Sequence, residues 1–451
     1  MKKASINIYF DNAEFADQIQ YSFEMLFNPL KGSDINLKFN ERDACDGISI
    51  EYRSDKKIEG SLHIKPQSII FSKSKNIDSL LPNKYIYKDY FLYSVELVAA
   101  ADRPFDQDGL LNFDIVEATF FHLSRLEEIS AGAQMLDKHG RMRSENQFLV
   151  HNKLHRIPVV DHIRAAVLDV LSLGHINQKT KYSLTHDIDC TKRFGSANRT
   201  VRAFARAALK ERSMGRVFSL AAQYWKKIRT KVDPYDTFDW LFSENKSERK
   251  VVFFMSGGKT SYDNLYSISD QFSRDVISNA LKNNYEIGLH PSYITFESIA
   301  DTSHERDVLS GIANKDIRSS RQHILRFNPG VTPHILQNSG MQYDYSMGYS
   351  DRVGFRCGTG LPFILFDWKV GKKGNVIEIP LVVMDGPLLM ENNYDIEKST
   401  SDLSAFINEN KRDTMITFNF HNSIFADTKV DFNKMKSMYI HLNKMISPAL
   451  V

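Results

Sequence analysis

The chain has 451 residues, of which 42% are hydrophobic and 25% charged, and its formal net charge is +3. This composition is typical of a globular protein of two or three domains. The three cysteines, Cys45, Cys190 and Cys357, are too far apart to form a disulfide framework, and no segment resembles a signal peptide or a membrane span. We therefore expect a cytoplasmic protein in a reducing compartment.

Residues 1–150 are predicted to form a small α+β domain with an accessory role. Apolar and polar residues alternate in three runs, as in half-buried strands. These runs are Ser5–Phe10, Ile48–Tyr52 and Ser61–Phe71. A helical run from Val116 to Glu128 contains the phrase FFHLSRLEE. The polar segment LDKHGRMRSENQF follows, and residues 151–180, with a helix near Asp161–Leu173, are expected to connect this domain to the rest.

From Lys181 to the end of the chain, short apolar strands alternate with helical segments. The strand candidates are YSLTHD, KVVFFMSG, YEIGLHP, RQHILRF, IEIPLVV and MITFNFHN. Helix-patterned stretches lie between them, at Ser267–Asn283, Glu297–Ala313 and Ser401–Asn410. Such alternation favours parallel strands in an α/β fold.

Carboxylate and imidazole groups fall at the carboxyl ends of these strands. Asp187 and Asp189 follow the first strand, and His290 and His421 end two others. Each residue alone is a weak signal, because loop aspartates usually make turns or caps. In a barrel, however, this rim is where catalytic groups gather, and sets of Asp and His commonly hold hydrolytic divalent metals.

Two further segments carry polar groups toward the same rim. Arg321 and His323, in RQHILRF, are two residues apart and would share one face of a strand. Buried there, they need a carboxylate or a metal as partner. Asp385, in VVMDG, is either a rim residue or an ordinary turn residue. Arg356, in the predicted loop Gly348–Pro362, either contacts a sugar hydroxyl or phosphate or is structural.

The order and spacing of these segments resemble the NodB-type polysaccharide deacetylases, also called carbohydrate esterase family 4. The first motif of that family, T-F-D-D-G, is matched by Thr185-His186-Asp187-Ile188-Asp189. The resemblance implies that Asp187 is the catalytic base. Ile188 stands where the family has a metal-binding aspartate, and Asp189 is our candidate replacement.

The second motif of the family, H-[ST]-x-x-[HS], carries a metal ligand at each end. His290 matches the first ligand, but Ile294 occupies the position of the second. Ser292 is too weak a ligand to replace it, so we expect His323 to be the third ligand. The predicted metal site therefore consists of Asp189, His290 and His323 and binds one divalent ion, with zinc as our expectation.

The resemblance also implies catalytic roles and a fold. Arg321 matches the arginine of the third motif and would hold Asp187 ionised, and His421 matches the late histidine that acts as general acid. The phrases LTHDID, GLHPSY, RQHILRF, DYSMGYSDRVGFRCGT and FNFHN, preceded by FFHLSRLEE, are most similar to a divergent branch associated with bacterial surface-polysaccharide synthesis. The implied fold for residues 181–451 is an incomplete (β/α) barrel.

The implied function is metal-dependent removal of an N-acetyl or similar group from an amino sugar of a surface polysaccharide or its precursor. Two alternatives stay open: deformylation of a lipid-linked sugar, and a catalytically degenerate barrel that binds carbohydrate. The missing second-motif ligand favours the degenerate barrel. The presence of Asp187, His290 and His421 together opposes it.

A basic insertion follows the first strand of the barrel. The segment Lys192–Lys231 contains twelve Lys or Arg residues and one acidic residue, Glu211, so it carries +11 while the rest of the chain carries −8. Its apolar residues recur at helical spacing. We expect an amphipathic helix that binds an anionic partner: the inner membrane face, a lipid-pyrophosphate sugar or an acidic polysaccharide, rather than nucleic acid. A solvated basic helix packed on the barrel is the alternative.

Overall fold

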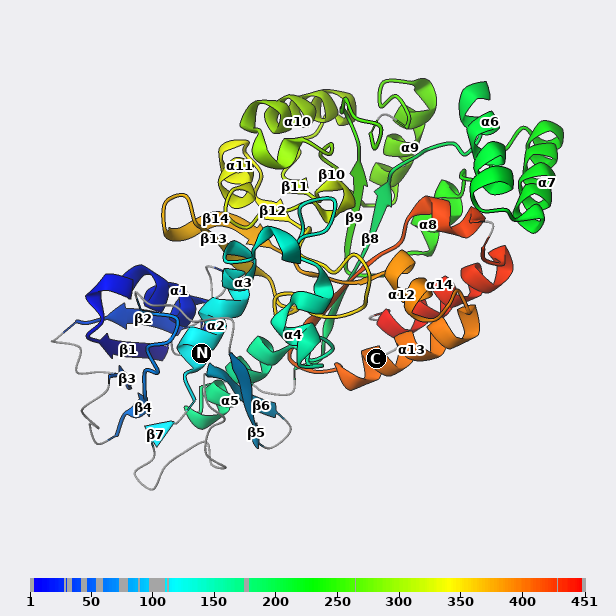
Figure 1. Ribbon diagram of the computed structural model, residues 1–451. Helices are drawn as coiled ribbons and strands as arrows, with labels where there is room; N and C mark the ends of the chain where they lie inside the picture. The colour runs from blue at the N-terminus through cyan, green and yellow to red at the C-terminus, as the bar shows by residue number, and fades with distance from the viewer. Residues whose placement is uncertain are drawn as a thin grey trace.

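The computed structural model describes residues 4–27, 30, 35–41, 47–53, 60–72, 80–87, 90–96, 110–111, 113–173, 178–263, 265–427 and 429–447. They form an α/β protein in which a small parallel sheet precedes a nine-stranded, strongly curled sheet (Figure 1). The predicted fold class, an incomplete barrel preceded in the sequence by a smaller N-terminal unit, is therefore confirmed.

The small sheet has the strand order β2-β1-β3-β4-β7, and all of its pairs are parallel. Its strands are β1 (Ala4–Phe10), β2 (Ile35–Phe39), β3 (Ile48–Tyr52), β4 (Leu62–Ile64) and β7 (Leu110–Leu111). A separate antiparallel hairpin joins β5 (Leu81–Tyr87) to β6 (Tyr90–Glu96). The helices of this region are α1 (Ala16–Phe27), α2 (Ile115–Leu123), α3 (Leu126–Ile129), α4 (Phe148–His151) and α5 (Val159–Val170).

The strand predicted over Ser61–Phe71 is shorter than expected, because β4 ends at Ile64. Beyond it, the backbone amides of Ile69 and Phe71 donate to the carboxylate of Glu117 rather than to a neighbouring strand. The carboxylate of Glu117 thus accepts the hydrogen bonds that a neighbouring strand would accept in a sheet. Apolar and polar residues therefore alternate in this segment although it is not a strand.

The helix predicted from Val116 to Glu128 is interrupted at Arg125, which adopts a left-handed conformation with φ 55°. Its buried guanidinium contacts the carboxylate of Glu128 at 2.7 Å and the carbonyl oxygen of Arg356 at 2.5 Å. Glu128 also forms a buried ion pair with Arg356 at 2.7 Å. The pair with Glu128 thus gives Arg356 a structural role, because it ties the loop Gly348–Pro362 to the FFHLSRLEE segment, and Arg356 also lines a cavity beside this loop.

The large sheet has the order β13-β14-β12-β11-β10-β9-β8-β16-β15. Adjacent strands of this sheet are parallel, except for the antiparallel pair β13–β14. The strands are β8 (Lys181–Ile188), β9 (Arg249–Phe254), β10 (Glu286–Leu289), β11 (Ser319–Ser320), β12 (Tyr343–Asp344), β13 (Phe363–Asp367), β14 (Lys372–Glu378), β15 (Leu381–Met384) and β16 (Met415–Asn419). Strands β13 and β15 form the two edges, so the barrel is open between them.

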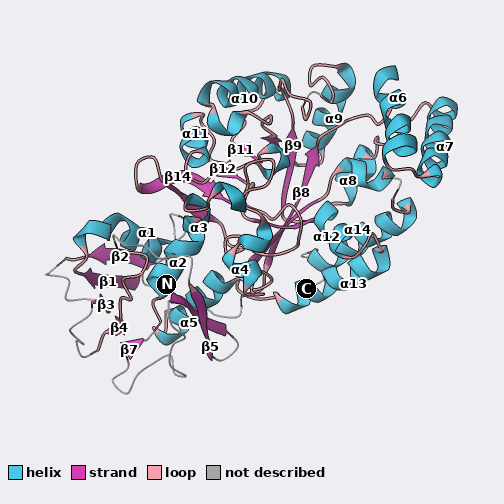
Figure 2. Cartoon of the chain, in the orientation of Figure 1, coloured by secondary structure: helices cyan, strands magenta, loops and turns pink. Residues whose placement is uncertain are grey.

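Helices cover the outside of the curled sheet (Figure 2). They are α8 (Phe238–Glu244), α9 (Gln271–Lys282), α10 (Ile299–Ala313), α11 (Thr332–Asn338), α12 (Asp385–Glu391), α13 (Ile396–Glu409) and α14 (Phe432–Ile446). Short 3-10 turns occur at Ala13–Phe15, Ala133–Met135, Ser144–Asn146, Thr295–Glu297, His323–Leu325 and Asn422–Ala426. Strand β9 ends in the run VVFF, in which all four side chains are buried, as expected of a parallel strand covered on both faces.

The small unit and the barrel share one hydrophobic core, which extends from α1 and α2 to β9 and β13. Tyr21 of α1 shows how closely they pack: its hydroxyl donates to the carbonyl oxygen of Ile364 at 2.8 Å, and its ring lies 5.2 Å from that of Phe366. Removing the small unit would therefore expose apolar side chains of the barrel.

The basic insertion forms α6 (Ala197–Ala205), a π-helical turn (Arg206–Lys210) and α7 (Met214–Thr230), which lie at one end of the molecule beside α8 and α9 (Figure 1). Across the described part of the chain, no helix combines the length and the apolar character needed to cross a bilayer.

Candidate metal centre

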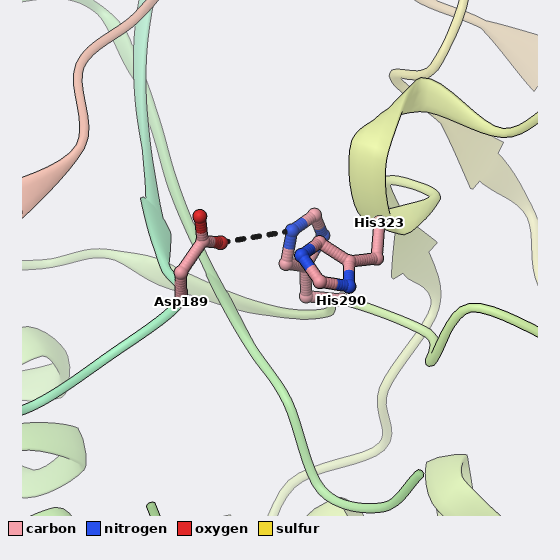
Figure 3. Close-up of side chains that lie close together, drawn as sticks. All are labelled: Asp189, His290 and His323. Atoms are coloured by element: carbon pink, nitrogen blue, oxygen red, sulfur yellow. Dashed lines mark ion pairs between the residues drawn. The ribbon is translucent and has the colours of Figure 1, made fainter. Parts of the chain in front are cut away.

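The three predicted metal ligands meet at the carboxyl end of the large sheet (Figure 3). Asp189 follows β8, His290 follows β10, and His323 follows β11. One possible ligand atom from each lies within 4.8 Å of the other two. Both histidines are buried and Asp189 is partly buried. This group of one carboxylate and two imidazoles could hold a metal ion.

Hydrogen bonding fixes the ring of His290. Its Nδ1 donates to the carbonyl oxygen of Arg321 at 2.5 Å, and its Nε2 lies 3.2 Å from Oδ1 of Asp189. A metal-binding histidine usually donates through its other ring nitrogen in this way. Burial lowers the pKa of His290, but the carboxylates of Asp187 and Asp189 outweigh burial and raise it. The ring therefore lies beside two carboxylates, of which Asp187 is paired with Arg321.

His323 reaches the group by a route different from the predicted one. The prediction that RQHILRF is a strand is wrong: β11 ends at Ser320, and His323 begins a 3-10 turn. The chain bends there because Ile324 and Leu325 have positive φ values of 61° and 51°, which is rare for a β-branched residue such as Ile. The bend brings the ring of His323 to 5.1 Å from that of His290, measured between centroids.

Asp263 belongs to the site, although no pattern in the sequence marks it. Its Oδ1 lies 3.3 Å from Nδ1 of His323 and accepts the amide of Tyr293 at 2.9 Å. Its Oδ2 accepts two hydrogen bonds from Thr260, one from the backbone amide at 3.2 Å and one from the side-chain hydroxyl at 2.7 Å. Burial raises the pKa of Asp263, but these hydrogen bonds lower it to about 2, so the carboxylate is ionised. It orients His323 through Nδ1 and leaves Nε2 for a ligand bond.

A buried ion pair joins Asp187 to Arg321 beside this group. Nη1 of Arg321 donates to Oδ1 of Asp187 at 2.7 Å, and the guanidinium lies over the ring of Phe253 at 4.5 Å. Burial raises the pKa of Asp187, but the charge of Arg321 outweighs burial and holds it below the usual range. Gly288 is needed here, because a Cβ at that position would lie 2.5 Å from the ring of Phe253.

Asn419 is a second residue that the sequence did not predict. Its Nδ2 donates to Oδ2 of Asp187 at 2.8 Å, and its Oδ1 accepts from Arg321 at 2.8 Å. A signal for it existed, because residues two apart on a strand share a face, and Asn419 precedes His421 by two positions in FNFHN. Both oxygens of Asp187 are thus held by buried donors.

His421 faces Asp187 and Asp189 from the other side of the rim. Its Nε2 lies 3.8 Å from Oδ2 of each carboxylate. Its Nδ1 lies 2.8 Å from Oδ1 of Asp385, and its amide donates to Oδ2 of the same residue at 2.7 Å. Burial lowers the pKa of His421, but Asp385, Asp189 and Asp187 raise it to about 10, so the ring is an imidazolium at neutral pH. Asp385 is therefore a rim residue and orients His421.

Two positions of the second motif lie outside the metal group. The hydroxyl of Ser292 donates to Glu305 at 2.5 Å, and its amide donates to the same carboxylate at 2.9 Å. The side chain of Ile294 is 38% exposed. Neither residue is among the three that could hold a metal, and His323 is the third member instead.

A cavity of about 300 Å³ lies beside the turn that carries His323. It is formed between the connector Asp137–Gln147 and the loop Gly348–Asp351, and Leu325 of the His323 turn contributes to its wall. Its other lining residues are mostly polar or charged and include Asp137, Arg143, Ser144, Glu145 and Asp351. Residues of the N-terminal third of the chain thus form part of a cavity that reaches the His323 turn at Leu325, and no residue of the metal group lines it.

A sequence profile described as a family of unknown function (DUF7033) matches residues 6–174. This range ends before β8, so it includes none of the residues of the metal centre. No curated protein matches the chain.

Proposed function

We propose that this protein is a metal-dependent hydrolase that removes an acyl group from an amino sugar of a surface polysaccharide or its precursor. The proposal combines the resemblance to the NodB-type deacetylases with the geometry of the rim. The observation that carries it is the position of His421, which is held by Asp385 and lies 3.8 Å from the carboxylates of both Asp187 and Asp189. An acid and a base thus face each other beside a group that could hold a metal.

Asp189, His290 and His323 would hold the metal ion. Two imidazoles and one carboxylate suit zinc, which in catalytic sites keeps three protein ligands and one open position. When bound, the ion supplies Lewis acidity, which lowers the pKa of water to roughly 7 and polarises a carbonyl group. Asp263 supports this assignment, because it pairs with the ring nitrogen of His323 that a ligand bond leaves free.

Asp187 accepts the proton of the attacking water in this mechanism. Arg321 and Asn419 fix both of its oxygens, so the carboxylate is ionised and cannot rotate away. His421 donates its Nε2 proton to the amide nitrogen while the bond between carbon and nitrogen breaks, and the amine leaves uncharged. Proton transfers of this kind typically contribute 10²–10⁴-fold to a rate.

The polar cavity beside the His323 turn favours a carbohydrate substrate. Sugar hydroxyls need several donors and acceptors, and the cavity offers Asp137, Arg143, Ser144 and Glu145. In this proposal one sugar ring occupies the cavity, whose wall includes Leu325 of the His323 turn. The segment Asp137–Gln147 thus shapes the substrate site in this proposal.

A second candidate function is carbohydrate binding without turnover. It is favoured by Ile294, which leaves the second motif with one ligand instead of two. Occupation of the third position by His323 weighs against it, because the donor set is restored by another residue. Measurement of acyl release separates the two functions.

The test uses the purified full chain with added Zn²⁺, a chitooligosaccharide as N-acetylated amino-sugar probe, and an aryl acetate as a general probe. We expect release of acetate that a chelator removes and Zn²⁺ restores, and that His290→Ala abolishes. His334→Ala is the matched control, because His334 pairs with a carboxylate outside the group. Acetate release by His290→Ala at the wild-type rate would refute the proposed site. Tight sugar binding without any release would favour the second candidate.

A further inference from the structure

The basic insertion, called here the arm (Lys192–Lys231), is a helical hairpin with a small core of its own. Phe194, Ala207 and Leu220 form that core. The two ends of the arm are tied together at its base, because the carboxylate of Asp233 accepts the amides of Arg193 at 2.6 Å and Phe194 at 3.1 Å. The arm is therefore an ordered element with defined faces.

One face of α7 is apolar and points into solvent. Met214, Phe218, Trp225 and Ile228 are 61%, 67%, 64% and 52% exposed. Their spacing of four, seven and three residues places them on one side of the helix. Leu220, on another side, is buried in the core of the arm. A surface helix normally turns its apolar side inward, so this outward seam needs another explanation.

Exposed apolar residues are concentrated in the arm. It contains seven of the eighteen large apolar side chains that are exposed in the described part of the chain, although it makes up less than a tenth of the sequence. Single exposed apolar residues are normal, but a contiguous group marks an interaction site. Val201 and Leu209, from the first half of the arm, are also exposed.

The arm is also strongly basic, with a net charge of +11. Its one acidic residue, Glu211, is paired with Arg206 and Arg216 within the arm. Arg202, Lys210, Lys226 and Arg229 have exposed side chains, and they lie in the same helical hairpin as the apolar seam. Whatever covers the seam must therefore be both apolar and anionic.

We propose that the arm docks the protein on an anionic lipid surface. The apolar seam of α7 enters the boundary between headgroups and acyl chains, and the basic side chains meet the lipid phosphates. A soluble polyanion would need the charge but not the seam, and a second copy of the chain would bring one +11 arm against another. This inference does not depend on the proposed hydrolase activity.

Docking through the arm would place the candidate site near the membrane. The arm leaves the barrel three residues after Asp189, at the carboxyl end of β8. A substrate carried on a lipid would then be presented at the rim from the bilayer side. The arm would thus contribute by localisation and would not take part in proton transfer.

The test is sedimentation of the full chain with two kinds of vesicle, pure phosphatidylcholine and a mixture containing phosphatidylglycerol, at low and high salt. The seam variant is Phe218→Ser with Trp225→Ser. The charge variant changes Arg202, Lys210, Lys226 and Arg229 to Gln. The matched control changes four exposed lysines elsewhere, Lys282, Lys315, Lys398 and Lys411, to Gln. Circular dichroism checks that each variant is folded.

We expect the wild type to bind the anionic vesicles at low salt and to be released from them at high salt. It should not bind the neutral vesicles. Each arm variant should reduce partitioning on the order of 100-fold or more, since each removes several interfacial contacts, while the control binds like the wild type. Absence of vesicle binding by the wild type would overturn the proposal, and so would equal losses in the control. Binding that survives the seam substitutions would assign the arm to a soluble polyanion instead. Self-association that the seam substitutions abolish, without vesicle binding, would assign it to a second copy.

Discussion

Asp263→Asn tests the metal centre most directly, because it changes one charge without removing a proposed ligand. The carboxylate of Asp263 accepts from Nδ1 of His323, from the amide of Tyr293, and from the amide and hydroxyl of Thr260. An asparagine has one acceptor oxygen and one donor nitrogen. In either orientation its NH₂ group faces a backbone N–H, and the negative charge beside His323 is lost.

The expected loss can be estimated from this geometry. Substitution of a carboxylate that orients a metal-binding histidine typically weakens metal binding 10–100-fold, which corresponds to about 1.4–2.7 kcal/mol. We expect the upper half of this range, since the substitution removes the charge and also a hydrogen bond. The measurement is Zn²⁺ affinity by competition with a fluorescent chelator, for the wild type and for Asp263→Asn. His323→Ala should weaken binding further than Asp263→Asn, because it removes a ligand.

Asp367→Asn is the matched control, because Asp367 forms the same kind of pair with Nδ1 of His334, at 2.9 Å, outside the metal group. Its Zn²⁺ affinity should equal that of the wild type. Wild-type affinity in Asp263→Asn would refute the orienting role of Asp263. Full Zn²⁺ occupancy in His323→Ala would show that the third ligand is another residue, and Asp187 is then the nearest candidate.

Three further predictions concern the acid–base pair and the buried charges. Asp187→Asn and His421→Ala should each lower kcat for acetate release by 10²–10⁴-fold while leaving Zn²⁺ affinity within a few fold of the wild type. Burial and a neighbouring guanidinium lower the pKa of His122 to about 3, so as the pH falls the imidazole binds a proton in the unfolded state before it does in the folded state. About 2 kcal/mol of the free energy of unfolding should therefore be lost between pH 6.5 and 5. His122→Phe should remove this part of the pH dependence of stability, measured by urea unfolding. Arg356→Met should lower the free energy of unfolding by about 3–5 kcal/mol, because it leaves Glu128 buried without its bidentate partner.

Each of these predictions has an outcome that contradicts it. Acetate release at the wild-type rate by either catalytic variant would remove that residue from the mechanism. An unchanged pH slope in His122→Phe would show that His122 is not the group that titrates in this range, whereas the exposed His151 should have no effect when replaced. If Arg356→Met unfolds at the wild-type urea concentration, the buried pair with Glu128 does not stabilise the loop.

The sequence predicted the elements that local pattern determines. Apolar runs bounded by polar residues predicted β8, β9, β10 and β16, because a parallel strand that is covered on both faces consists mainly of apolar residues. The polar residues just beyond those runs had to meet at one rim, since parallel strands in one sheet end on the same side. Local pattern could therefore place Asp189 and His290 on the same rim, whereas their pairing as metal ligands was implied by the resemblance to the NodB-type deacetylases.

The rest of the site depends on backbone conformations that local pattern does not determine. His323 lies in the group as expected, but alternation along RQHILRF was the wrong reason for expecting it, because His323 reaches the group through a turn in which Ile324 has a positive φ. Such a conformation is costly for a β-branched residue and persists only where surrounding contacts fix it. Here the amide of His323 donates to the carbonyl oxygen of Pro291, next to His290, so the chain that carries one predicted ligand fixes the turn that carries another.

The substitution Ile324→Gly relaxes this turn and should therefore stabilise the local backbone conformation. It should weaken Zn²⁺ binding only if the Ile324 side chain itself helps to hold the ring of His323. Equal Zn²⁺ affinity in Ile324→Gly and the wild type would show that the backbone alone positions this ligand.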